Sequence, residues 1–187
     1  MNAETQFATR RFTVDEVLAM QEAGIFGDFE KVELLNGELV PMQAKLDRHE
    51  AYKTALVRRL ILGLPNDVDV LIEPTLYASA VSAPDPDIMV LNKGWKLREV
   101  KPADVRLVVE VADTSLAKDL GVKAAIYARF GVEDYWVIDA KAGRLIIHRG
   151  PEGETWREVR RLTGEEPATP LAFPSLSIRL RDLVARG

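Results

Sequence analysis

Two short apolar, strand-like runs stand on either side of one helix pattern, and this order most constrains the fold. The runs are residues 106–111 and 135–139, and the helix pattern between them covers residues 116–130. Gly131 follows the helix pattern at the position where a left-handed C′ residue usually ends a helix. A strand on each side of a crossover helix predicts a mixed β-sheet covered by helices on both faces.

Local signals indicate further elements on either side of this unit. Thr13 and Glu16 form a capping-box pattern that predicts a helix from Val14 to about Gly24. Asn36-Gly37 predicts a hairpin, because this dipeptide favours the tight turn between two strands. The other expected elements are hairpin strands at 29–35 and 38–42, a helix at 47–62, strands at 68–73, 75–78, 88–91, 145–148 and 155–162, and a C-terminal helix at 177–185.

The composition restricts the classes of function. The 187 residues suit a single domain at 12–187 after a flexible arm at 1–11. Because the chain has no cysteine, no signal-peptide pattern and no apolar run of membrane-spanning length, we expect a cytoplasmic protein with no membrane partner. The net charge of −4 argues against static binding of nucleic acid through basic residues, but it allows an enzyme that meets a phosphodiester through metal ions.

Two acidic residues lie in apolar runs that we expect to be neighbouring strands. Asp87 opens the run at 88–91, and Glu110 lies inside the run at 106–111. If the strands pair with both carboxylates on one face, the two groups suit a hard divalent cation, which accepts oxygen ligands and cancels their repulsion. The alternative, that Asp87 is a turn residue after Pro86, stays open on this evidence alone.

The following helix pattern adds a lysine. Asp119, Lys123 and Tyr127 are spaced four residues apart and therefore share one face of the helix. Ala112 points the same way as Glu110, and its small side chain leaves space for a lysine that reaches in from elsewhere. The alternative is an exposed Asp119–Lys123 pair without a functional role.

In this order, the segments resemble the Uma2-type (DUF820) restriction-endonuclease family of the PD-(D/E)XK nuclease superfamily. The resemblance covers residues 12–150 and rests on segments 33–40, 86–90, 108–112 and 131–139, together with His49, Asp119, Lys123, Tyr127 and Ala128. It implies an α/β, restriction-endonuclease-like core: a central mixed β-sheet flanked by α-helices, with an N-terminal helix and hairpin extension.

The resemblance also assigns roles. Asp87 corresponds to the family's first acid, with Asp85 as the competing choice, and Glu110 corresponds to the second acid. The chain departs from the basic pattern two residues after Glu110, where Ala112 stands in place of the lysine. The family's shift of this lysine to the next helix implies that Lys123 takes the role.

These roles predict a divalent-metal-dependent endonuclease that hydrolyses phosphodiester bonds in DNA. Asp87, Glu110 and the backbone carbonyl of Val111 would hold Mg²⁺ or Mn²⁺, with Lys123 as the catalytic lysine and Glu33 and His49 as candidate supporting residues. We expect a homodimer or higher homo-oligomer, because cutting two strands usually requires two active sites.

Two other functions stay open: a catalytically silent scaffold or interaction module, and a phosphatase or other metal hydrolase acting on small substrates. We expect the remaining aromatic positions to be structural, with His148 on a strand surface and Trp95, Trp136 and Trp156 in packing contacts.

Overall fold

A six-stranded mixed sheet forms the centre of the computed structural model, which describes residues 10–27, 31–42 and 45–183. Its strand order is β3-β4-β5-β6-β7-β8. The pair β5–β6 is parallel, and the other four pairs are antiparallel. The strands are β3 (Val68–Ile72), β4 (Ile88–Asn92), β5 (Val105–Ala112), β6 (Asp134–Asp139), β7 (Arg144–Glu152) and β8 (Thr155–Thr163).

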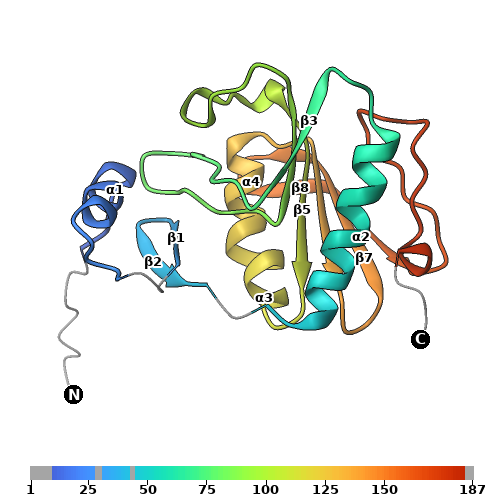
Figure 1. Ribbon diagram of the computed structural model, residues 1–187, viewed down its shortest axis with the longest axis horizontal. Helices are drawn as coiled ribbons and strands as arrows, with labels where there is room; N and C mark the ends of the chain where they lie inside the picture. Colours follow the sequence, from blue (N-terminus) through green and yellow to red (C-terminus); the bar gives the residue numbers. More distant parts are fainter. Residues whose placement is uncertain (1–9, 28–30, 43–44, 184–187) are drawn as a thin grey trace.

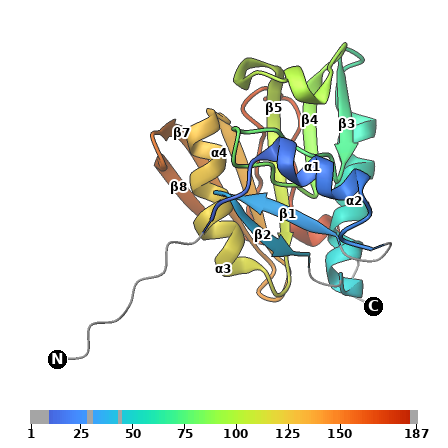
Figure 2. The same cartoon turned by 90° about the vertical axis from the view of Figure 1, so that its left-hand side faces the viewer.

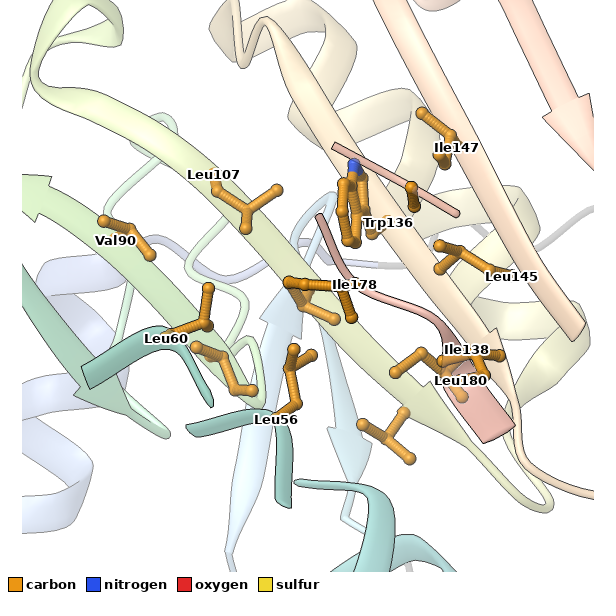
Figure 3. Packing of buried hydrophobic residues seen from close by; sticks show 14 of the residues in the cluster. Leu56, Leu60, Val90, Leu107, Trp136, Ile138, Leu145, Ile147, Ile178 and Leu180 are labelled. Carbon is orange, nitrogen blue, oxygen red and sulfur yellow. The ribbon is translucent and has the colours of Figure 1, made fainter. Parts of the chain in front are cut away.

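One face of the sheet is covered by α2 (Asp47–Gly63), which lies on the opposite side of the sheet from α4 (Figure 1). Leu56 and Leu60 of α2 are fully buried in the core cluster on this face, and the C-terminal segment adds Ile178 and Leu180 (Figure 3). Trp136 is the largest side chain of this core. The apolar stripe of α2 therefore fixes the helix, including its first turn, against the sheet.

The other face is covered by the predicted crossover helix, which consists of α3 (Leu116–Lys118), a π-helical turn η3 (Asp119–Lys123) and α4 (Ala124–Phe130). Gly131 ends it with φ +96°, as the left-handed C′ position requires. Tyr127 and Tyr135 are buried in the cluster on this face, with ring centroids 4.8 Å apart. A π turn within an α-helix is often found at a functional site.

The N-terminal extension consists of α1 (Val14–Glu22) and the hairpin β1 (Val32–Leu35) and β2 (Glu38–Pro41), which lie together on one side of the molecule (Figure 2). The capping box at Thr13 is present. Val17, Leu34 and Ala83 form a separate small core, and the backbone N–H of Ala83 donates to the carbonyl of Leu34. This contact ties the hairpin to the segment that leads into β4.

Three further helices are short 3-10 turns: η1 (Leu97–Glu99), η2 (Pro102–Asp104) and η4 (Leu180–Asp182). In the described part of the chain, no helix has both the length and the apolarity that crossing a membrane requires. Of the arm predicted at 1–11, residues 1–9 lie outside the described residues, and Arg11 donates to the backbone carbonyl of Asn36.

Two predicted elements are wrong. Residues 75–78 form a loop rather than a strand, because the chain turns at Glu73 and folds back so that Leu76 donates to Pro84. The helix predicted at 177–185 is replaced by an extended stretch and the turn η4, while residues 184–185 lie outside the described residues. The backbones of Ile178 and Ala168 exchange two hydrogen bonds, which require an extended backbone.

His148 is also a correction, because it is buried rather than on a strand surface. Its ring packs against those of Tyr135 and Trp156, with ring centroids 5.3 and 5.6 Å away. Burial lowers the pKa of His148 to about 4. Trp136 and Trp156 pack as expected, whereas Trp95 is exposed and donates to Asp69.

Candidate active site

Asp87 lies where β4 begins, and three donors from different parts of the chain hold its carboxylate. The backbone N–H of Val111 donates to Oδ2 at 2.8 Å, His49 Nε2 lies 3.0 Å from Oδ2, and Lys45 Nζ donates to Oδ1 at 3.1 Å. Val111 can donate to a side chain because the β4–β5 ladder ends at the pair Ile88–Val109. The carboxylate of Asp87 thus accepts a hydrogen bond from β5 that a backbone carbonyl would accept if the β4–β5 ladder continued.

Glu110 lies on β5 with its side chain on the face covered by the crossover helix. The β4–β5 register, continued by one residue beyond Ile88–Val109, places it opposite Asp87. Tyr127 donates its hydroxyl hydrogen to Glu110 Oε1 at 2.7 Å, and Lys123 Nζ lies 2.6 Å from the same oxygen. The structure therefore brings the two predicted acids to adjacent strands at one end of the sheet.

Lys123 comes from the π turn and is almost completely buried. Its Nζ lies 2.6 Å from Glu110 Oε1 and 2.7 Å from Glu33 Oε1, and it donates to the carbonyl of Asp85 at 3.3 Å. The exposed pair with Asp119 is therefore not what the structure shows. Asp119 is itself buried and accepts a hydrogen bond from Ser115.

Glu33 belongs to the hairpin, yet its side chain is 1% exposed and reaches the same site. Its Oε2 lies 2.7 Å from Lys118 Nζ, and its Oε1 accepts the backbone N–H of Asp85 at 3.0 Å in addition to the ammonium of Lys123. The structure thus places Glu33, a predicted candidate supporting residue, at the same cavity. Asp85 is also nearby, but Asp87 is the aspartate opposite Glu110.

His49 lies in the first turn of α2 and is buried. While its Nε2 contacts Asp87, its Nδ1 lies 3.2 Å from Glu50 Oε1. A histidine held at both ring nitrogens by carboxylates has a fixed ring orientation. The structure therefore places His49 where it can orient the carboxylate of Asp87.

A closed ring of six ionisable side chains continues from this contact, and four of its members were not predicted. Glu73 Oε1 lies 2.5 Å from Lys45 Nζ and 2.6 Å from Lys53 Nζ. Lys53 Nζ is also 2.7 Å from Glu50 Oε1. In order, the ring contains Asp87, His49, Glu50, Lys53, Glu73 and Lys45.

The environment perturbs the pKa values of these groups in different directions. Burial alone would raise the pKa of Asp87, but His49, the N–H of Val111 and the charge of Lys45 outweigh it and hold the pKa at about 2. Burial raises the pKa of Glu110 well above its usual value, and the charge of Lys123 opposes that rise. Lys123 has a raised pKa, because the nearby carboxylates of Glu110, Glu33 and Asp119 outweigh its burial.

These groups line one cavity of about 60 Å³, large enough for a few water molecules. Six carboxylates line it, together with three lysines and one histidine, so the lining is net negative. Asp113, a residue that was not predicted, is among them. Its Oδ1 is buried without a hydrogen bond among the described residues, although Arg48 and Lys141 lie 3.8 and 3.7 Å away. The sequence does carry a signal for Asp113, because this acid directly follows an apolar strand.

The residues present fit a hard divalent cation. Asp87 and Glu110 could supply carboxylate oxygens. The carbonyl of Val111 would add a third oxygen on the side of β5 that faces Asp87, because the N–H and C=O of one strand residue point the same way. Among the described residues, no group of three His, Asp or Glu side chains is arranged to hold a metal ion. An ion at this site would therefore complete its coordination with water, as Mg²⁺ commonly does.

Comparisons with known proteins bear on the family and the fold of the chain. A family model described as "Uma2: Putative restriction endonuclease" matches residues 14–181. The crystal structure of a "putative nuclease belonging to DUF820" from Anabaena variabilis ATCC 29413 aligns with a TM-score of 0.71 at 15% sequence identity, covering 92% of this chain and 97% of that chain. No match is found among curated proteins. The structural similarity confirms the predicted fold.

Proposed function

The chain belongs to the Uma2 family, and on this basis we propose that it is a divalent-metal-dependent endonuclease that hydrolyses phosphodiester bonds in DNA. The observation that carries the proposal is the convergence of Asp87, Glu110 and Lys123 on one water-accessible cavity. They come from the residue before β4, from β5 and from the π turn. Net negative charge around that cavity favours a cation, through which a polyanionic substrate can then approach.

Each residue of the site has its own role in this proposal. Asp87, Glu110 and the Val111 carbonyl would hold Mg²⁺ or Mn²⁺, which when bound supplies a water of lowered pKa and polarises the phosphate. His49 and the N–H of Val111 orient Asp87. The ammonium of Lys123 orients the attacking water and offsets the negative charge that develops in the transition state, in a buried site where such charges interact strongly.

Glu33 has a supporting role in this proposal. It contacts the ammonium of Lys123 from the side opposite Glu110 and so limits the positions that the lysine can take. We further propose a symmetric dimer, because cutting both strands of a duplex requires two such sites. Light scattering on the purified protein measures its mass and tests this point.

The experiment that tests the function is a cleavage assay on supercoiled, linear duplex and single-stranded DNA with Mg²⁺, with Mn²⁺ and with EDTA. We expect metal-dependent cleavage of at least one substrate, at least a hundredfold slower for Glu110→Gln. Arg106→Ala, on the exposed start of β5, is the matched control and should cleave like the parent. Cleavage that persists in EDTA would contradict the proposal, and hydrolysis of a small phosphomonoester but of no DNA would favour a different metal hydrolase.

A further inference from the structure

Lys45 is the cation in direct contact with the aspartate that we propose as a metal ligand. It stands just before α2, its side chain is 23% exposed, and it lines the cavity of the candidate site. Its Nζ donates to Asp87 Oδ1 at 3.1 Å and to Glu73 Oε1 at 2.5 Å. Lys45 therefore bridges a buried functional carboxylate and a second, more exposed one.

Glu73 is held in place by a strained backbone. It has φ +52°, which is unfavourable for a residue other than glycine, and Pro74 follows it. Its backbone N–H donates to the carbonyl of Asp87 at 3.1 Å, which ties the backbones of the two residues together. Such strain persists where the surrounding structure requires it, commonly near functional sites. Here it places a carboxylate beside Lys45 and one residue beyond the end of β3.

Lys53 provides the comparison that shows what is particular to Lys45. Both ammonium groups contact Glu73 Oε1, at 2.6 Å for Lys53 and 2.5 Å for Lys45. Lys53 makes its second ion pair with Glu50, on its own helix, and is buried. Lys45 instead makes its second ion pair with Asp87, inside the cavity.

We propose that Lys45 is a displaceable cation of the site: it neutralises Asp87 when no divalent cation is bound, and it binds a phosphate of the substrate when one is. This proposal rests on the proposed function. An ion that takes Asp87 Oδ1 removes only one of the two contacts of Lys45, since the pair with Glu73 remains. A lysine has three N–H donors, so a Lys45 anchored at Glu73 keeps donors for a phosphate at the cavity.

The consequence is a pair of opposite effects. Because the ammonium of Lys45 competes for Asp87, its removal should strengthen binding of a divalent cation. Because the same ammonium contacts the phosphate, its removal should weaken binding of the polyanion. A residue that only maintains the fold would weaken both when it is removed.

The test compares Lys45→Met with Lys53→Met, two variants that each remove one partner of Glu73 and keep an aliphatic stem. Calorimetric titration with Mn²⁺ should give an affinity on the order of tenfold tighter for Lys45→Met than for the parent, equivalent to about 1.4 kcal/mol. Lys53→Met should bind Mn²⁺ with the parent's affinity. Lys45→Arg keeps the charge and should also resemble the parent.

Fluorescence anisotropy of a labelled DNA duplex, with Ca²⁺ in place of Mg²⁺, provides the second measurement. Lys45→Met should bind the duplex several-fold more weakly than either the parent or Lys53→Met, while thermal melts confirm that both variants are folded. If the parent binds no Mn²⁺, the proposed function fails and the Lys45 proposal with it. If the parent binds Mn²⁺ but Lys45→Met binds it equally or more weakly, or if its DNA affinity is unchanged, the Lys45 proposal alone is overturned.

Discussion

Replacement of Lys123 by methionine tests the electrostatics of the site without relying on catalysis. The ammonium of Lys123 lies 2.6 Å from Glu110 and 2.7 Å from Glu33, and all three side chains are almost completely buried. Methionine fills a similar volume without charge. The substitution therefore leaves two buried carboxylates facing each other with their shared cation removed.

The expected loss of stability follows from this burial. Removing one partner of a buried ion pair typically costs about 3–5 kcal/mol, because the remaining charge is desolvated and uncompensated. In a chain of 187 residues, each kcal/mol lowers Tm by about 2–4 °C, so Lys123→Met should melt ~6–20 °C below the parent. Lys118 still contacts Glu33, which places the loss toward the lower end of this range.

The assay is a thermal melt followed by circular dichroism at neutral pH in EDTA, with and without subsequent addition of Mg²⁺. A second substitution, Glu33→Gln, removes one of the uncompensated charges, and the double variant should regain about 1–2 kcal/mol relative to Lys123→Met. Mg²⁺ should raise the Tm of Lys123→Met more than that of the parent, since it then supplies the missing positive charge. A Lys123→Met protein that melts within 2 °C of the parent in EDTA would refute the reasoning.

Three other predictions use separate features of the structure. Lys123→Ala should lower the cleavage rate by about 10²–10³-fold, and Ala112→Lys in that background should restore part of it in the cleavage assay, because the new ammonium enters the same space from β5. Burial lowers the pKa of His148 from 6.5 to about 4, so the unfolded chain binds the proton more readily than the folded protein. The free energy of unfolding should therefore be highest above pH 6.5 and decrease by about 1–2 kcal/mol as the pH falls toward 4. Chemical denaturation at a series of pH values measures this decrease, which should be absent in His148→Phe. Gly131→Ala should destabilise the protein by about 1–2 kcal/mol in urea titration, because φ is +96° and the new Cβ meets Pro102, whereas Gly121→Ala, in open space within the π turn, should be neutral or stabilising.

The sequence singled out the two acids and the lysine as candidates, because each carries a local signal, and their roles stay predictions. Asp87 and Glu110 are acids inside apolar strands, and such a charge needs a partner. Helical spacing and the small side chain of Ala112 favoured Lys123, and the family resemblance implied its role. Their contacts required the structure, since the pairing of β4 with β5 and the π turn together decide which oxygens meet the ammonium.

The ring that contains Glu73 includes site residues that the sequence did not predict. Glu73 had a signal comparable to that of Asp87, since it closes an apolar strand directly before a proline, but it was assigned only to a strand end. Lys45 had none: it lies between the hairpin and α2, and its contact with Asp87 joins residues 42 positions apart. Contacts of this kind depend on tertiary packing, which local patterns do not encode.

His148 was predicted to lie on a strand surface, and the structure buries it instead. Strand β8, which was predicted at 155–162, pairs with β7, and Trp156 from β8 packs against the histidine. The prediction of a C-terminal helix is wrong because this segment also makes tertiary contacts that its local pattern does not show. Leu176, Ile178 and Leu180 are buried in strict alternation, a strand pattern that outweighed the local helix signal once Ala168 was available as a partner.

The most direct measurement compares cleavage of duplex DNA by the parent protein and by Asp87→Ala in the presence of Mg²⁺ or Mn²⁺. We expect metal-dependent cleavage by the parent and a loss of at least a hundredfold in Asp87→Ala, with no binding of Mn²⁺ by the variant in calorimetric titration. Equal cleavage by the two proteins would contradict the assignment of the site. No cleavage and no metal binding by the parent would identify the protein as a silent scaffold on a nuclease fold.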